Sequence, residues 1–379
     1  MSGRLPLLLL LCAGCVARTA TPPDKAIPSA SRAPYESAPT ATHTVEVEVD
    51  GRAAREILAT LARPHYEPAD AKRLEDLPAV RLTIRDSGRT AESFERDLAA
   101  AFVEESRPAV FDFGPIRKGR ERWGVLLEAI AARERELVRM ASDRARALLP
   151  ADRALSLRMK VFLSFGLAGL ADHLLVTTPE GQEVMIVDLA RALGEAEEEP
   201  VPAQLERVAR LIAGEAFRRA WSDYRRGHPS WSRSPAALGP VAPLIRIVAE
   251  AGPVAIFFVD ENFFPLSVWL KEPMKRNLDE LNRTAERLIT AEGDLDQRVT
   301  LAAEIQRPEF SRRLAGPAGA FLADGIFQVS GIDALRAALA GGPRAFFQAY
   351  DRAAQQDRSL LPLSREIRDR LTSPPSPGS

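Results

Sequence analysis

The most informative stretch of the chain spans residues 203–226 and reads AQLERVARLIAGEAFRRAWSDYRR. Its apolar side chains recur every three or four positions, as they do on one face of an α-helix. They are Leu205, Val208, Ile212, Ala216, Ala220 and Tyr224. The spacing predicts one continuous amphipathic helix whose apolar face packs into a protein core.

The middle of this predicted helix resembles the metal-binding helix of secreted zinc-dependent peptidases of the H-E-x-x-H, or gluzincin-like, type. The segment is 213–225, AGEAFRRAWSDYR. In such a helix two His residues one turn apart hold zinc, and the Glu between them activates the bound water. By this resemblance, Glu215 stands at the position of the general base. Gly214 and Arg218 stand where the two His ligands would be.

Other segments are similar to the same family and follow in the same order. A predicted strand hairpin precedes the helix, and GPVA at 252–255 follows it, with Ala251 where the family carries its third, acidic ligand. GAFLA at 319–323, GIDAL at 331–335 and GPRAFFQAY at 342–350 are similar to the C-terminal helices. The resemblance begins at about residue 184 and implies a gluzincin-like metallopeptidase architecture.

The residues at these positions do not suit a metal. Gly214 and Ala251 supply no donor atom, and Arg218 is a permanent cation. At 4 Å and an effective dielectric of 20, two unit charges interact by about 4 kcal/mol, so Arg218 would repel a divalent ion. We therefore expect no cofactor, with zinc present only if other residues rebuild the site. Glu215 is then expected to pair with Arg218 or Arg219 on the helix surface.

The four histidines offer no obvious replacement site. They are His43, His65, His173 and His228, and no two share ligand spacing on one helix or strand. We expect His173 to be a capping or surface residue at the start of a strand, and His228 to be a solvated residue beyond the end of the helix. Neither a G-x-S-x-G nor a P-loop motif occurs.

The N-terminus has the order of a bacterial export signal. Arg4 precedes the apolar run 7–11, and small residues lead to Cys15. Ala13-Gly14-Cys15 is similar to the end of a lipobox, so 1–14 is predicted to be a signal peptide and Cys15 the lipidated residue. An ordinary cleaved signal is the alternative. The region 15–42 is rich in Pro, Ser, Thr and Ala and predicts a flexible, lipid-anchored tether. By analogy, Val16 after the cysteine favours the outer membrane over the inner one.

The rest of the sequence predicts a mainly α protein with a small antiparallel sheet, folded as one peptidase-like domain over 43–372. Strands are expected at 44–49, 160–165, 174–178 and 183–187, and helices at 91–105 and 120–149. The domain would be helical to about residue 150, carry its sheet over 160–188 and its remnant metal helix over 203–226, and then be helical again. We expect no later membrane span and a disordered tail at 373–379. The aromatic residues Phe257, Phe258, Phe263, Phe264 and Trp269 are expected in the core, with a groove as the alternative.

These observations together predict a non-catalytic pseudopeptidase that binds an extended peptide or an envelope protein, with the hairpin 174–187 as its binding surface. Two other functions stay open: an active hydrolase with a rebuilt site around Glu215, and a passive envelope lipoprotein. The formal net charge is −1, with acidic and basic residues interspersed, so nucleic acid is not an expected partner.

Overall fold

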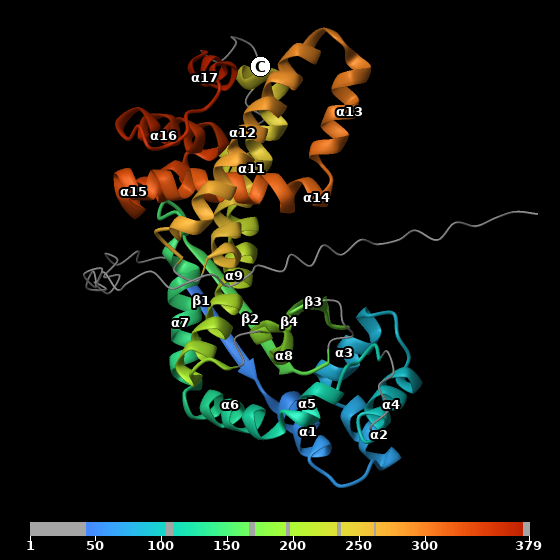
Figure 1. Ribbon diagram of the computed structural model, residues 1–379. Coiled ribbons are helices and arrows are strands. Elements are labelled where there is room, and N and C mark those ends of the chain that lie inside the picture. Colours follow the sequence, from blue (N-terminus) through green and yellow to red (C-terminus); the bar gives the residue numbers. More distant parts are fainter. Residues whose placement is uncertain are drawn as a thin grey trace, which may run out of the picture. The chain divides into compact units, whose positions relative to one another are not determined.

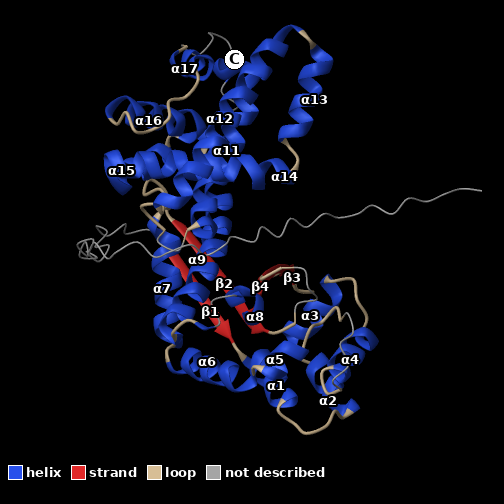
Figure 2. Ribbon diagram, viewed as in Figure 1, coloured by secondary structure: helices blue, strands red, loops and turns tan. Residues whose placement is uncertain are grey.

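The computed structural model describes residues 43–103, 109–166, 171–194, 198–232, 236–260 and 263–373. The predicted signal peptide, lipidated Cys15 and tether lie outside these ranges, as does the predicted tail beyond Ser373. Within the described ranges the protein is mainly helical, as expected, with one four-stranded sheet (Figures 1 and 2).

The sheet consists of β1 (His43–Asp50), β2 (Leu155–Ser164), β3 (His173–Thr177) and β4 (Glu183–Asp188), in the order β1-β2-β4-β3. The expectation of an antiparallel sheet is wrong, because β1 pairs with β2, and β2 with β4, in parallel. Only β3 is antiparallel, and it forms the predicted hairpin with β4. The helices between β1 and β2 provide the long crossover that parallel neighbours need, whereas a short turn is sufficient for the hairpin.

Helices precede, interrupt and follow these strands. Before β2 they are α1 (Arg52–Leu61), α2 (Pro68–Glu75), α3 (Pro78–Asp86), α4 (Ala91–Ala100), α5 (Gly114–Lys118), α6 (Arg120–Ala132) and α7 (Glu134–Ala147). After β4 come α8 (Leu189–Leu193), α9 (Val201–Arg226), α10 (Pro229–Ser232), η2 (Ala236–Val241), α11 (Ala242–Val259), α12 (Val268–Thr290), η3 (Ala291–Gly293), α13 (Leu295–Ile305), α14 (Pro308–Phe310), η4 (Ser311–Ala315), α15 (Gly316–Ala340), α16 (Gly342–Gln356) and α17 (Arg365–Thr372).

The single helix expected over 120–149 is instead two helices, α6 and α7. The break lies at Arg133, whose φ of −118° and ψ of 23° are not helical. Glu134 and Glu136 in the first turn of α7 favour a new helix N-terminus there, because acidic groups stabilise that end. Ile130 and Leu137 are both buried and seven residues apart. The apolar repeat is therefore preserved across the break, which is why the sequence pattern did not reveal it.

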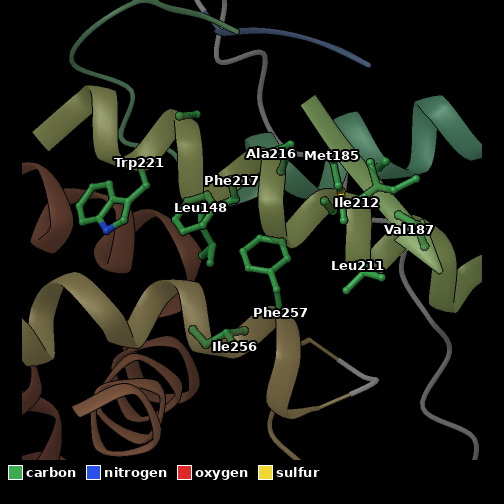
Figure 3. Close-up of a cluster of buried hydrophobic side chains, with 14 of the residues drawn as sticks. Leu148, Met185, Val187, Leu211, Ile212, Ala216, Phe217, Trp221, Ile256 and Phe257 are labelled. Carbon is green, nitrogen blue, oxygen red and sulfur yellow. The ribbon is translucent and has the colours of Figure 1, made fainter. Parts of the chain in front are cut away.

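The predicted helix 203–226 is confirmed as α9, which packs against α7, α11 and β2. Figure 3 shows its residues Leu211, Ile212, Ala216, Phe217 and Trp221 among Met185 and Val187 of β4 and Ile256 and Phe257 of α11. This cluster belongs to the hydrophobic core that the described helices and strands share. The helix thus presents buried residues to neighbours on more than one side.

Helix α11 is also central to the core, because it packs against α9, α15 and α16. Gly252 makes the contact with α15 close: a Cβ there would lie 2.4 Å from the carbonyl carbon of Gly319. Residues 238–259 have a mean hydropathy of 1.7, so by length and composition alone they could cross a membrane. The core helix of a globular protein has the same properties, and more than half of this window is buried.

Candidate functional site

Gly214 lies in the middle of α9, where it faces the end of α11. A Cβ on Gly214 would lie 2.6 Å from Cζ of Phe258 and 2.9 Å from Cβ of Phe257. Real Cβ atoms do not come so close to other heavy atoms, so a larger residue requires the aromatic side chains to move. The space beside the first ligand position of the resemblance is therefore occupied by the side chains of Phe257 and Phe258.

Glu215, which follows Gly214 directly in α9, is the centre of a small polar cluster. Its carboxylate accepts hydrogen bonds from Nε of Arg218 at 2.7 and 3.1 Å, and its Oε1 lies 3.2 Å from Nε2 of His173. The other ring nitrogen of His173, Nδ1, lies 2.7 Å from Asp172. Two carboxylates and two cationic side chains thus alternate in the order Asp172, His173, Glu215, Arg218.

The predicted partner of Glu215 is correct, but its predicted location is wrong. Arg218 does pair with Glu215, whereas Arg219 pairs with Glu183 of β4. Glu215 is only 5% exposed, so the pair is not on the helix surface. The reason is that β3 and the end of α11 cover this side of α9. His173 is likewise neither a cap nor a surface residue, since its side chain is 19% exposed and contacts Glu215.

Electrostatics within the cluster favour the charged form of each group. Burial by itself would lower the pKa of His173, but the hydrogen bonds to Asp172 and Glu215 outweigh burial and raise the pKa to about 9. Burial would raise the pKa of Glu215, yet the His173 hydrogen bond and the Arg218 charge keep it below its usual value. His173 is therefore an imidazolium at neutral pH, and a doubly protonated ring cannot accept a proton as a general base.

The arrangement does not suit a metal ion. Asp172 and Glu215 lie at opposite nitrogens of the His173 ring, so their oxygens do not converge on one point. Across the described ranges, no three His, Cys, Asp or Glu side chains are placed to hold a metal. These carboxylates instead pair with His173 and Arg218.

The remaining histidines and Ala251 lie apart from this cluster. His43 is buried and its Nε2 contacts the carbonyl oxygen of Pro150, while His228 contacts Asp152. His65 is exposed. Ala251 follows Glu250, whose carbonyl accepts a hydrogen bond from Trp221, seven residues beyond Gly214 on α9. Phe257 and Phe258, rather than Ala251, are the α11 residues that lie against Gly214.

Phe258 connects the cluster to the protein surface. Its ring is stacked on that of His173, with centroids 6.2 Å apart and planes 6° from parallel. The residue is 43% exposed, unlike Phe257, Phe263 and Phe264, which are buried as expected. Trp269, also expected in the core, is 72% exposed. Phe258 thus presents an accessible aromatic surface directly beside the first residue of β3.

Strand β3 forms one edge of the sheet, and the hydrogen bonds at its ends show which groups face outward. Asp188 N–H donates to the carbonyl of Asp172, and Thr178 N–H donates to that of Gln182. Antiparallel pairing alternates, so His173, Leu175 and Thr177 direct their backbone N–H and C=O groups away from β4. Arg85 of α3 donates to the outward carbonyl of Thr177. Among the described residues, no hydrogen bond reaches the outward groups of Leu175.

Sequence reasoning identified Glu215, Arg218 and the hairpin, but it missed Asp172 and Phe258. Asp172 precedes His173 directly, and an adjacent acid and imidazole could have suggested an ionic pair. The contact of His173 with Glu215 joins residues 42 positions apart, which no local pattern reveals. No family model, curated protein or solved structure matches this chain. The site is therefore described by its own geometry.

Proposed function

We propose that this protein is a non-catalytic pseudopeptidase that binds an extended peptide or protein segment at the edge of β3. The observation that carries the proposal is the outward-facing N–H and C=O of Leu175 on the edge strand β3, whose first residue, His173, stacks on the accessible ring of Phe258. An added strand would pair with these backbone groups, and an apolar side chain of the ligand would rest on Phe258. Backbone pairing supplies affinity, and the aromatic contact supplies selectivity.

The loss of catalysis is part of the same proposal. A gluzincin-like site needs two His ligands one turn apart, and Gly214 and Arg218 stand in their place. Phe257 and Phe258 fill the space beside Gly214, and Glu215 is held by Arg218 and His173. The carboxylate of Glu215 is thus held by two cationic side chains. Binding is the activity that this geometry still supports.

The test removes one outward backbone N–H of β3 and keeps the hydrogen bonds between β3 and β4. Leu175→Pro removes the outward N–H of β3 without removing a β3–β4 hydrogen bond, and Pro is tolerated on edge strands. Peptides selected from an array by the wild-type protein should bind the Leu175→Pro variant at least tenfold more weakly, with Leu175→Ala as the matched control that keeps the N–H. Equal binding by both variants would show that the peptide binds elsewhere. If the wild-type protein selects no peptide from the array, a passive lipoprotein is favoured.

The active hydrolase is the competing account, and two results would favour it. Elemental analysis of the purified protein would find near-stoichiometric zinc, and Glu215→Gln would abolish peptide cleavage. We expect neither zinc nor cleavage.

We further propose that the protein is exported to the bacterial cell envelope and anchored through a lipid on Cys15, with the outer membrane as its location. Mass spectrometry of the mature N-terminus tests this directly. A diacylated Cys15 is expected, whereas cleavage after Cys15 without lipid would identify an ordinary secreted protein.

A further inference from the structure

A second polar site lies at the C-terminal end of α9, beyond the Glu215 cluster in the middle of the helix. A pocket of about 280 Å³ opens between the last turns of α9, the short helix α10 and the first turns of α11. The residues that line it are Ser222, Arg225, Arg226, Trp231, Ser232 and Arg246. Three guanidinium groups and two hydroxyl groups therefore surround one small cavity.

The carboxylates around this pocket do not balance its cations. Oε1 of Glu250 accepts from Arg225 at 2.7 Å and from Arg246 at 2.8 Å, so one oxygen serves two guanidinium groups. Arg226 pairs with Asp223 at 3.1 Å. Among the described residues, two carboxylates thus contact these three cationic side chains, which leaves one positive charge in excess.

Arg225 is the most constrained of these cations. Its guanidinium carbon lies 5.6 Å from the ring centroid of Trp221 and 5.8 Å from that of Trp231. Its Nε is buried, and it finds no acceptor among the described residues. Burial lowers the pKa of Arg225, and the charge of Glu250 offsets burial only in part. A further negative charge in the pocket would therefore stabilise this side chain.

We propose that the pocket binds a phosphate group. The planar fork of arginine matches phosphate oxygens in pairs, and several arginines around one cavity are typical of phosphate recognition. Phosphate offers more acceptor oxygens than a carboxylate does, which suits three guanidinium groups. The phosphate can belong to a soluble compound or to a lipid head group, since both present the same oxygens to the pocket.

Thermal unfolding of the full mature chain tests the proposal, with inorganic phosphate titrated against chloride at constant ionic strength. Phosphate should raise the unfolding temperature in a saturable way, because a ligand that binds only the folded state stabilises it. The double variant Arg226→Gln with Arg246→Gln should need at least about tenfold more phosphate to reach half of the maximal rise in unfolding temperature. The reason is that each lost charge-assisted bond weakens binding by about that factor. Arg283→Gln is the matched control, because Arg283 is an exposed arginine paired with Glu280 on α12.

A second variant keeps the test decisive if the double variant unfolds. Ser222→Asp adds a carboxylate to the pocket lining, where it should pair with the excess cation. This variant should unfold at a higher temperature than the wild type without phosphate, and it should no longer respond to phosphate. Two results would overturn the proposal. In the first, phosphate raises the unfolding temperature of Ser222→Asp as much as that of the wild type. In the second, phosphate raises the unfolding temperature of the wild type no more than chloride does.

Vesicles distinguish the two sources of phosphate. With the chain produced from residue 16 onward, so that no lipid on Cys15 attaches it, phosphatidylglycerol vesicles should retain the wild-type protein and Arg283→Gln but release the double variant if a lipid head group is the ligand. A response to inorganic phosphate without such retention assigns the pocket to a soluble phosphate compound. If neither phosphate nor vesicles distinguish the double variant from Arg283→Gln, the pocket is not a phosphate site.

Discussion

Gly214→Ala is the substitution that most sharply tests how α9 and α11 meet. The added Cβ would lie 2.9 Å from Cβ of Phe257 and 2.6 Å from the ring of Phe258. The ring of Phe258 is partly exposed and can rotate away, but Cβ of Phe257 is fixed by its backbone. Overpacking of this kind costs about 1–3 kcal/mol, whereas the better helix propensity of Ala returns about 1 kcal/mol. We expect a net loss of about 0–2 kcal/mol in the free energy of unfolding.

Urea denaturation of the folded region measures this loss, and Gly124→Ala is its matched control. Gly124 lies within α6, and a Cβ there would meet nothing within 4 Å. Because Gly124→Ala improves the helix propensity and adds no clash, it should stabilise the protein by about 0.5–1 kcal/mol. If Gly214→Ala stabilises the protein as much as Gly124→Ala does, Phe257 and Phe258 do not occupy the space that we assign to them.

Two further predictions concern the cluster around Glu215. The pKa of His173 rises from 6.5 to about 9 on folding, which corresponds to about 3 kcal/mol of stability that is fully present below pH 6.5 and lost as the pH rises through 9. The difference in unfolding free energy between the wild type and His173→Gln should therefore shrink over that window, and a difference that stays constant with pH would contradict the shift. Arg218→Met leaves the buried carboxylate of Glu215 with His173 alone, so it should destabilise the protein by about 1–3 kcal/mol in urea denaturation. The neighbouring Arg219→Met, which breaks the more exposed pair with Glu183, should cost less than about 1 kcal/mol, and equal losses would show that burial of the pair is unimportant.

Local patterns predicted the parts of the fold that depend on neighbouring residues. The helix 203–226 and the hairpin of β3 and β4 have clear periodicity and a turn between the strands, and both are confirmed. The parallel pairing of β1 with β2 could not be read in this way, because it joins segments more than 100 residues apart. The break at Arg133 was also hidden, since the apolar repeat continues through it.

In the candidate site too, a contact between residues close in sequence was predicted, whereas contacts between distant residues were not. The pairing of Glu215 with Arg218 follows from helical spacing and was predicted. Its burial depends on His173 and Phe258, which reach α9 from β3 and α11. The sequence could show that Gly214 lacks a metal-binding atom, but only the packing of the helices shows that Phe257 and Phe258 fill the space beside it.

A peptide-library experiment decides whether the protein binds peptides without cleaving them. The full mature protein is incubated with a library of unstructured peptides, and the peptides that it retains and those left in solution are both read by mass spectrometry. Our account predicts that a subset of peptides is retained and that every peptide is recovered uncleaved. Cleavage products that disappear with Glu215→Gln would contradict it and would identify a working hydrolase.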